Sequence, residues 1–281
     1  ARGGTAVTES LKQIVSHTQS VRPMVHSITN NVTINDCANI ILAAGGTAIM
    51  AQDEREVEEI TSHADALALN MGALRAQEAM LLAARASKRL GHPVVLDPVA
   101  AGASRLRSEM CGRLLAEGLV SVIRGNASEI RALAAGQENA AGVEVDALDR
   151  VTEQNLAESA AWLRQFSRQT GVVVMLTGVI DLITDGQRTA VLRGGSELMG
   201  RITGAGCMLT SLTALYCGAN PNKLFEAAVA AAEVMNHCGE QAQVRVRKEM
   251  KGTASFRTRL IDAVSLLTAD DLANVHQIQL I

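Results

Sequence analysis

The segment that decides the fold is Gly200-Arg201-Ile202-Thr203-Gly204-Ala205-Gly206-Cys207-Met208-Leu209-Thr210, a glycine-rich turn that leads into an apolar run typical of a helix. The first amide groups of a helix have no intrahelical partner, and Gly204 and Gly206 let another molecule approach them closely. The partial positive charge at a helix N-terminus favours an anion such as a phosphate group. It would also favour the thiolate form of Cys207. The segment therefore predicts an anion site beside a thiol; the alternative is an ordinary loop that caps a helix.

Short apolar runs without polar alternation recur along the chain, at residues 24–28, 47–50, 64–69, 94–96, 120–123 and 172–176. Such runs are typical of parallel strands that helices cover on both faces. Between and after them, helical patterns are predicted at 8–20, 35–43, 54–62, 75–90, 107–116, 126–135, 152–168, 207–217, 222–246 and 253–267, with a loop at 136–149. The order predicts an α/β fold with a mainly parallel central sheet between two helical layers.

Two further features complete the prediction of architecture. The runs Ile180 to Thr184 and Arg188 to Leu192 flank Asp185-Gly186, which predicts an antiparallel hairpin at one edge of the sheet. The chain has no evident linker or internal repeat, so residues 1–281 are predicted to form a single domain. The ending, residues 275–281, fits no predicted element.

Composition excludes several classes of function. With 2% aromatic residues and a net charge of −3, the chain offers neither a stacking surface nor a basic face for nucleic acid or a membrane. Five scattered cysteines without a C-x-x-C pair indicate free thiols in a reducing compartment. The N-terminus lacks the apolar core of a signal peptide, and no apolar run is long enough for a transmembrane helix. The expected location is the cytoplasm.

In open parallel sheets, ligands bind beyond the carboxyl ends of the strands. Polar or glycine-containing segments follow several predicted strands, and we expect them to line one crevice that faces the glycine turn. They are Asn30, Met50, Asn70-Met71-Gly72, Asp97-Pro98, Arg124-Gly125-Asn126 and Thr177-Gly178.

Four residues at or just after these strand ends favour phosphate chemistry. Arg124 places a guanidinium at a strand end, where it could bind phosphate oxygens. Asn126 and Glu129 have the spacing of a capping box, which alone would explain both, while Glu129 could also reach Mg²⁺. Asp97, before Pro98, could bind a metal or cap its own turn. A cation, two carboxylates and an anion site together predict phosphoryl transfer from a nucleotide.

Two common nucleotide-binding motifs are missing from the sequence. It contains no G-x-x-x-x-G-K-[ST], which excludes a P-loop enzyme, and no G-x-G-x-x-G, which argues against a dehydrogenase.

Asn126 to Glu129, Thr177-Gly178 and the late Thr203-Gly204-Ala205-Gly206 before a helix resemble the ribokinase-like superfamily. There the position of Cys207 usually holds the aspartate that removes the proton from the substrate hydroxyl. A cysteine there, together with Val25-His26-Ser27-Ile28-Thr29-Asn30-Asn31-Val32 and Leu96-Asp97-Pro98-Val99-Ala100, resembles the hydroxyethylthiazole kinase family of thiamine salvage. By motif order the resemblance covers about residues 10–270, and the first and last of these motifs together are quite specific.

The resemblance implies a three-layer ribokinase-like fold without a separate lid domain. It also implies ATP- and Mg²⁺-dependent phosphorylation of the primary hydroxyl of 4-methyl-5-(2-hydroxyethyl)thiazole, by a homotrimer with sites at subunit boundaries. The residues that it assigns to substrate are Met50, Gly204, Asn30, Val32, Gly72 and Met71. Those assigned to ATP are Arg124, Thr177, Asn126, Gly206 and Ala205, and those assigned to Mg²⁺ are Glu129 and Asp97.

Cys207 is interpreted as a weak catalytic base that also shapes the pocket, although it could simply be a small residue that fits the turn. His26, on an apolar strand, is expected to be a hydrogen-bonded core residue and not a catalyst. Three other functions remain open. They are a kinase for hydroxymethylpyrimidine or another small alcohol, a non-catalytic sensor of a nucleotide or vitamin precursor, and a dehydratase acting on a hydrated nicotinamide cofactor.

Overall fold

The computed structural model describes residues 2–136, 150–274 and 278–281. Within them, one nine-stranded sheet has the order β2-β1-β3-β4-β5-β6-β7-β8-β9. Strands β1 to β6 are parallel, and β7, β8 and β9 continue the sheet antiparallel. The strands are β1 (Met24–Ile28), β2 (Thr47–Ile49), β3 (Ala66–Asn70), β4 (Val94–Asp97), β5 (Val122–Gly125), β6 (Val173–Leu176), β7 (Ile180–Thr184), β8 (Thr189–Arg193) and β9 (Gln279–Leu280).

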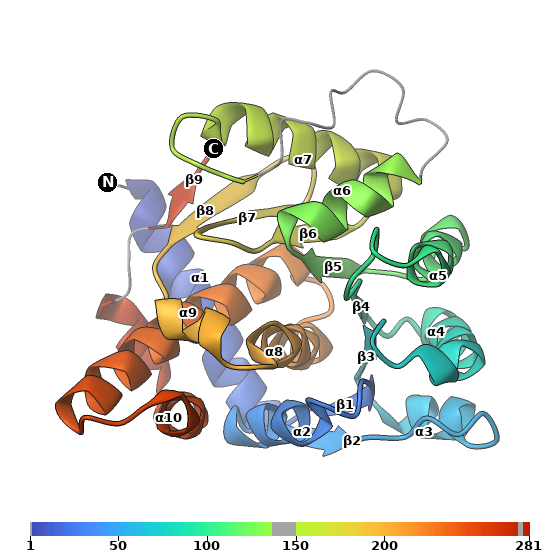
Figure 1. The fold of residues 1–281 in the computed structure, drawn as a ribbon, viewed down its shortest axis with the longest axis horizontal. Coiled ribbons are helices and arrows are strands. Elements are labelled where there is room, and N and C mark those ends of the chain that lie inside the picture. Colours follow the sequence, from blue (N-terminus) through green and yellow to red (C-terminus); the bar gives the residue numbers. More distant parts are fainter. Residues whose placement is uncertain (1, 137–149, 275–277) are drawn as a thin grey trace.

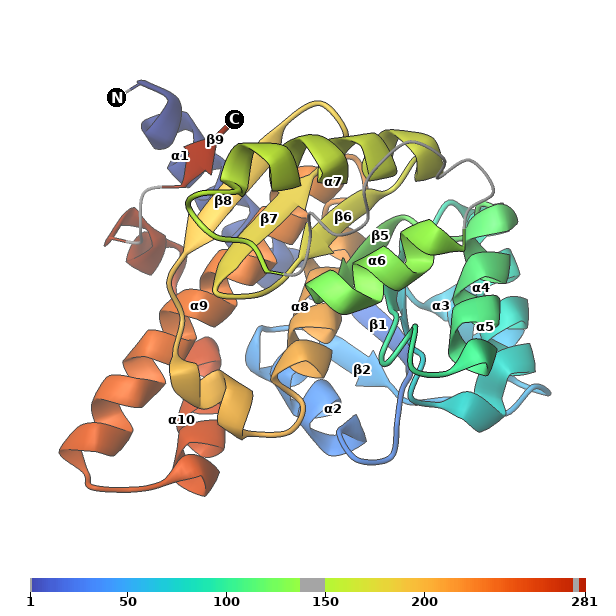
Figure 2. The same ribbon diagram turned by 45° about the horizontal axis from the view of Figure 1, so that its top comes forward.

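Helices cover both faces of this sheet, as expected (Figure 1). One layer contains α1 (Arg2–Val21), α2 (Ile34–Ala43), α8 (Ala205–Ala219), α9 (Leu224–Lys248) and α10 (Thr253–Leu266). The other contains α3 (Val57–His63), α4 (Gln77–Leu90), α5 (Arg105–Ala116), α6 (Ala127–Ala135) and α7 (Leu156–Thr170). The short 3₁₀ segments are η1 (Leu74–Ala76), η3 (Glu197–Arg201) and η4 (Ala269–Asn274). The rotated view shows the two layers on either side of the strands (Figure 2).

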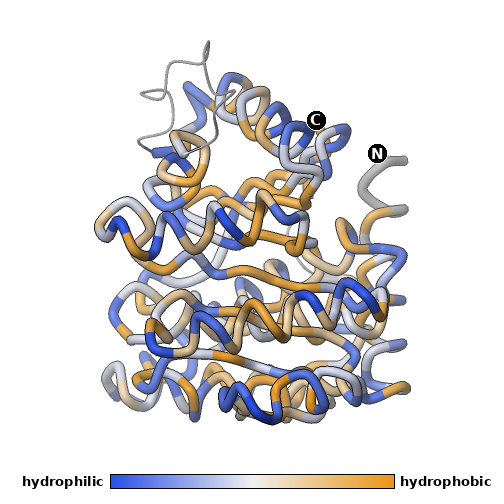
Figure 3. The backbone as a smooth tube through the Cα atoms, turned by 90° about the vertical axis from the view of Figure 1, so that its right-hand side faces the viewer, coloured by the Kyte–Doolittle hydropathy of each residue, from blue (hydrophilic) through white to orange (hydrophobic). Residues whose placement is uncertain are grey.

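The two helical layers enclose two separate hydrophobic cores, one on each face of the sheet. Neighbouring strand residues point to opposite faces, so Val95 belongs to the first core and Leu96 to the second. The hydropathy colouring shows the same division: apolar segments run along the inner elements, and the outer helices alternate between polar and apolar (Figure 3). Burial on both faces explains why the central strands have no polar alternation.

The structure corrects several local predictions. The strand at 47–50 was expected to be buried, but β2 is half-buried because it lies at the edge of the sheet. The β7–β8 hairpin is not the other edge, since β9 pairs with β8 beyond it. Helix α1 begins before the predicted start at residue 8, whereas α3 and α7 begin three or four residues after theirs. The predicted loop at 136–149 lies outside the described residues, apart from Gly136.

Candidate active site

The glycine-rich turn packs against two other elements at the carboxyl edge of the sheet. Gly204 is the N-cap of α8, with a φ of +93° that favours glycine. A Cβ at Gly204 would lie 2.8 Å from Cγ2 of Thr33, and one at Gly206 would lie 2.7 Å from a terminal nitrogen of Arg124. Close packing therefore requires glycine at both positions. The lack of side chains there also leaves the first amide groups of α8 accessible.

Arg124 is the centre of a buried polar network beside this turn. Its Nη2 lies 2.8 Å from Oδ2 of Asp97, its Nε donates to Oγ1 of Thr210, and its Nη1 donates to Oγ1 of Thr177 at 3.3 Å. Thr210 in turn donates to Oδ2 of Asp97. Burial lowers the pKa of Arg124, but the charge of Asp97, the hydrogen bond to it and the charge of Glu129 together more than offset this, so the pKa lies above its usual value. The guanidinium is thus held as a fixed positive charge at the end of β5.

Cys207 lies within reach of two amide groups whose orientation is fixed by the backbone. Nδ2 of Asn70 lies 3.2 Å from Sγ of Cys207, and Nδ2 of Asn30 lies 3.6 Å from it. The Oδ1 atoms of both side chains accept backbone N–H groups, from Gly72 for Asn70 and from Val32 and Thr33 for Asn30. Because the oxygens are occupied in this way, the amide nitrogens face the sulfur as donors. Donors of this kind stabilise a sulfur that carries negative charge.

The two candidate metal ligands differ in how far they are already engaged. Asp97 is fully buried, and its Oδ1 has no hydrogen-bond partner among the described residues, which leaves an acceptor free for a metal or a water. Both oxygens of Glu129 accept backbone N–H groups, from Ala100 and from Asn126. With the Asn126 side chain accepting from Glu129 N, this completes the capping box of α6. Carboxylates of this kind suit Mg²⁺, which commonly binds one or two carboxylates together with water and phosphate oxygens.

A cleft of about 500 Å³ opens beside Arg124 and the N-terminal end of α8. Its apolar lining includes Val179, Leu209 and Met235, and its polar lining includes Asp181 and Asn236. Four of the residues predicted to bind ATP line this cleft: Arg124, Thr177, Ala205 and Gly206. Asn126 does not; it lines a neighbouring hollow of about 410 Å³, which shares Thr177, Gly178 and Val179 with the cleft. The 177–179 loop therefore separates the two spaces.

The residues predicted to bind substrate are brought together only in part. Gly72 lies against Asn30, since a Cβ at Gly72 would be 2.8 Å from Cβ of Asn30. Val32 is 74% exposed and Met50 is half-buried. Met71 is fully buried in the second core, so its side chain is not at the surface of the site. Asn30, Gly72 and Gly204 thus gather near Cys207.

Other positions agree with their sequence interpretation. His26 is fully buried, with its ring nitrogens 2.9 Å from Oγ1 of Thr61 and 2.8 Å from the Ala51 carbonyl oxygen, and burial lowers its pKa. It is a core residue, as expected.

No helix in the described ranges is long and apolar enough to cross a membrane.

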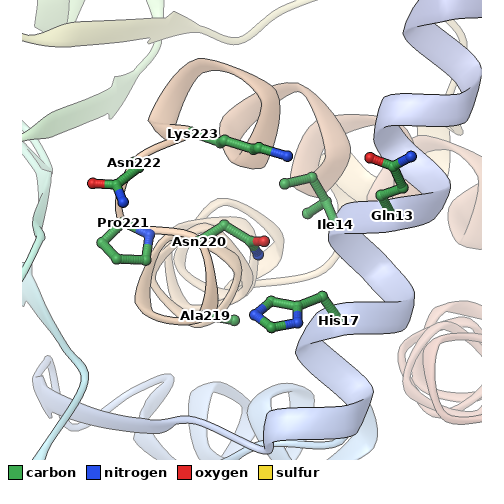
Figure 4. A pocket seen from close by; sticks show the side chains of 8 residues that line it. All are labelled: Gln13, Ile14, His17, Ala219, Asn220, Pro221, Asn222 and Lys223. Atoms are coloured by element: carbon green, nitrogen blue, oxygen red, sulfur yellow. The ribbon is translucent and has the colours of Figure 1, made fainter.

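A smaller hollow, of about 300 Å³, lies at the other end of α8, between α1 and the turn that precedes α9 (Figure 4). Ala219 and Asn220, at the C-terminal end of α8, line this hollow, whereas Cys207 is in the first turn of the same helix. The hollow is therefore separated from Cys207 by the length of α8. Close to it, Gly218 packs against Ala66 of β3, since a Cβ at Gly218 would lie 3.1 Å from Cβ of Ala66.

Sequence reasoning missed the roles of four residues in this site. Thr210 was part of the quoted segment and Asn70 was placed in the crevice, but neither was given a partner. Asp181 follows Thr177-Gly178 by a few residues inside an apolar strand, and an acidic residue there is unusual enough to have been noticed. Asn236 lies within a long helix, and nothing in the surrounding sequence marks it as a functional residue.

The mainly parallel sheet between two helical layers, with a glycine turn, a basic strand end and a cleft at its carboxyl edge, is an α/β fold of the ribokinase-like class. The fold is shared with a pyridoxal kinase of Bacillus subtilis solved as an ADP complex, at a TM-score of 0.57 and 19% identity, over 76% of this chain and 90% of that one.

The particular family follows from closer similarities. The sequence model of the Hydroxyethylthiazole kinase family matches residues 15–270, and the chain belongs to this family. The hydroxyethylthiazole kinase of Clostridium acetobutylicum is 44% identical over 264 residues, which cover 93% of this chain and 96% of that protein. The solved structure of hydroxyethylthiazole kinase from Pyrococcus horikoshii OT3 covers 99% of both chains, with a TM-score of 0.82 and 30% identity.

Proposed function

We propose that this protein transfers the γ-phosphoryl group of ATP to the primary hydroxyl of 4-methyl-5-(2-hydroxyethyl)thiazole, giving the monophosphate used in thiamine salvage. The family supplies the reaction and the substrate. The observation that carries the assignment to this site is the Arg124 guanidinium packed against Gly206. A fixed cation and the N-terminus of α8 thus line the cleft, and Cys207 lies in the same first turn of that helix.

In this proposal the nucleotide occupies the 500 Å³ cleft, with its phosphates at Arg124, Thr177 and the amide groups of Ala205 and Gly206. Guanidinium and helix N-terminal amides are suited to phosphate oxygens. The apolar side chains farther along the cleft then face the nucleoside. Catalysis of this kind depends mainly on positioning the reactants and neutralising charge.

Mg²⁺ would be held by Glu129 and Asp97, whose free Oδ1 atom fits an additional ligand. An ion held there would supply charge neutralisation for the transferred group. The chain's own contribution is to keep Arg124 and both carboxylates together at the carboxyl edge of the sheet, where β4 and β5 end and α6 begins. Asp97 does this through its contacts to Arg124 and Thr210.

The thiazole alcohol would lie on the Cys207 side of the turn, near Asn30, Gly72 and Gly204. Cys207 would accept the hydroxyl proton, and the amide nitrogens of Asn30 and Asn70 would stabilise the negative charge on its sulfur. Met50 and Val32 are the remaining residues proposed to contact the substrate. In a homotrimer with sites at subunit boundaries, their exposed surface would be covered by a neighbouring subunit. The proposed location is the cytoplasm.

ADP release from Mg-ATP by the purified protein tests this function, with hydroxyethylthiazole, hydroxymethylpyrimidine or no acceptor. We expect release that depends on the thiazole alcohol and a phosphorylated product by mass. Release with the pyrimidine alone would instead identify the protein as a hydroxymethylpyrimidine kinase. Tight ATP binding without release would instead favour a sensor.

The base role of Cys207 is tested by two substitutions. Cys207→Asp should retain or raise activity, because a carboxylate is ionised at neutral pH and can accept the proton. Cys207→Ser should lower activity, because a hydroxyl is a far weaker base. An inactive Cys207→Asp protein beside a fully active Cys207→Ser protein would rule out the base role.

A further inference from the structure

A buried pair of polar side chains, Asp181 of β7 and Asn236 of α9, lies at the inner surface of the 500 Å³ cleft. Each is only 7% exposed. Oδ1 of Asp181 accepts the backbone N–H of Gly178 at 2.9 Å, and Oδ2 accepts Nδ2 of Asn236 at 3.0 Å. Both carboxyl oxygens are therefore already engaged by donors of the protein. The pair is suited to holding backbone in place, not to binding a ligand through the carboxylate.

The pair connects the two walls of the cleft. Gly178 belongs to the 177–179 loop and directly follows Thr177, whose hydroxyl accepts from Arg124. In the second segment that lines the cleft, beyond the paired residue Arg193 of β8, Gly195 has a φ of +89°, and a Cβ there would lie 2.9 Å from Oδ1 of Asn236. One turn farther along α9, Glu240 accepts the backbone N–H of Gly195 at 2.9 Å. One face of α9 thus supports one wall directly and the other through Asp181.

The electrostatic setting agrees with a structural task for the carboxyl group. Burial raises the pKa of Asp181, while the hydrogen bonds from Gly178 and Asn236 and the charge of Arg124 act in the opposite direction. An acidic group beside a cleft for a polyanion would repel phosphates if it were free. Here the donors from Gly178 and Asn236 occupy its two oxygens.

We propose that Asp181 and Asn236 are positioning residues for the nucleoside triphosphate, fixing the spacing between the 177–179 loop and the wall at Gly195. The proposal rests on the function proposed above. If the pair is disrupted, the loop shifts, and the Thr177 hydroxyl moves relative to Arg124. The affinity for nucleotide then falls, whereas the Cys207 side of the turn is unaffected.

An exchange of the two residues tests this directly. Asn236→Asp places two carboxyl groups face to face, and we expect the Kd for ADP and the KM for ATP to rise about tenfold, as for the loss of one hydrogen bond to a charged group. In the double variant Asp181→Asn with Asn236→Asp, the new amide can accept from Gly178 N and donate to the new carboxylate. We therefore expect the double variant to return to within about threefold of wild type.

The readouts separate positioning from general damage. The KM for the thiazole alcohol should stay within about twofold of wild type in both variants, and circular dichroism with thermal unfolding checks the fold. Asn222→Asp, an exposed change at the far end of α8, is the matched control and should leave nucleotide binding unchanged.

Three results would overturn the proposal. They are an unchanged ADP affinity in Asn236→Asp, equal losses for ATP and thiazole, and a double variant no better than the single one. ADP binding by calorimetry needs no catalysis, so it tests the pair even if wild type fails to release ADP with the thiazole. That failure would refute the proposed function alone. A wild-type protein that binds no nucleotide would refute both.

Discussion

Gly206→Ala tests whether the close contact between the glycine turn and Arg124 carries function. The added Cβ would lie 2.7 and 2.9 Å from the two terminal nitrogens of Arg124, well inside the 3.4 Å at which ordinary contact begins. The guanidinium must therefore move, although Asp97, Thr210 and Thr177 hold it in place.

The size of the effect follows from the contacts that are lost. One hydrogen bond to a charged group contributes about 1.5–3 kcal/mol. Since each 1.4 kcal/mol is a factor of about ten, losing one such bond to a phosphate oxygen should lower kcat/KM for ATP about 10- to 100-fold. The KM for the thiazole alcohol should change far less, because the added methyl group faces Arg124.

The assay is coupled ADP release at varied ATP and at varied thiazole, with thermal unfolding as a check on the fold. Gly112→Ala is the matched control, because Gly112 lies inside α5 and a Cβ there meets nothing within 4 Å. It should leave kinetics unchanged and stabilise the helix by about 1 kcal/mol. A Gly206→Ala protein with kcat/KM for ATP within threefold of wild type would refute the proposed phosphate role of this contact.

Three further predictions follow from charge and burial. Of the five cysteines, Cys207 is half-buried and the other four are buried, with burial raising their pKa to about 11 or 12, so one thiol should react rapidly with a disulfide reagent in the native protein. Loss of that fast phase in Cys207→Ser checks the assignment; two or more fast thiols in wild type would contradict it. Glu129→Gln keeps an oxygen that can accept from Asn126 N but removes the charge and the acceptor for Ala100 N, so the Mg²⁺ concentration for half-maximal activity should rise about tenfold or more and Tm should fall modestly. An unchanged Mg²⁺ dependence would remove Glu129 from the metal site. Burial raises the pKa of Asp181 in the folded state, so its ionisation costs stability as the pH rises above the unfolded value of about 3.9. In urea unfolding between pH 4 and pH 7, the free energy of unfolding of Asp181→Asn should therefore rise relative to that of wild type as the pH rises. A relative fall over that range would mean that the pKa of Asp181 is lowered in the folded state, contrary to the prediction.

Most of the fold could be predicted from the sequence because its signals are local. Short continuous apolar runs between turn signals favour strands buried on both faces, and β1, β4 and β6 lie within a residue of their predicted bounds. Asp185-Gly186 predicted the β7–β8 hairpin for the same reason, since a tight turn depends on the residues within it. The edge strand β2 was expected to be buried and β9 was not predicted, because the position of a strand in the sheet depends on residues far away in the chain.

The features of the candidate site likewise fall into those set by local sequence and those set by contacts between distant residues. The sequence by itself determined that a glycine turn opens a helix and that Asn30, Asp97, Arg124 and Thr177 lie at or just beyond the carboxyl ends of strands, because those features depend on spacing along the chain. Only the tertiary structure decided which of them meet.

The orientation of the Asn30 and Asn70 amides toward Cys207 depends on contacts between residues 137 and 177 positions apart. The Asp181–Asn236 pair joins a strand to a helix 55 positions later. Such pairs leave no periodic trace in a sequence, because the two partners are brought together by the fold and not by their spacing along the chain.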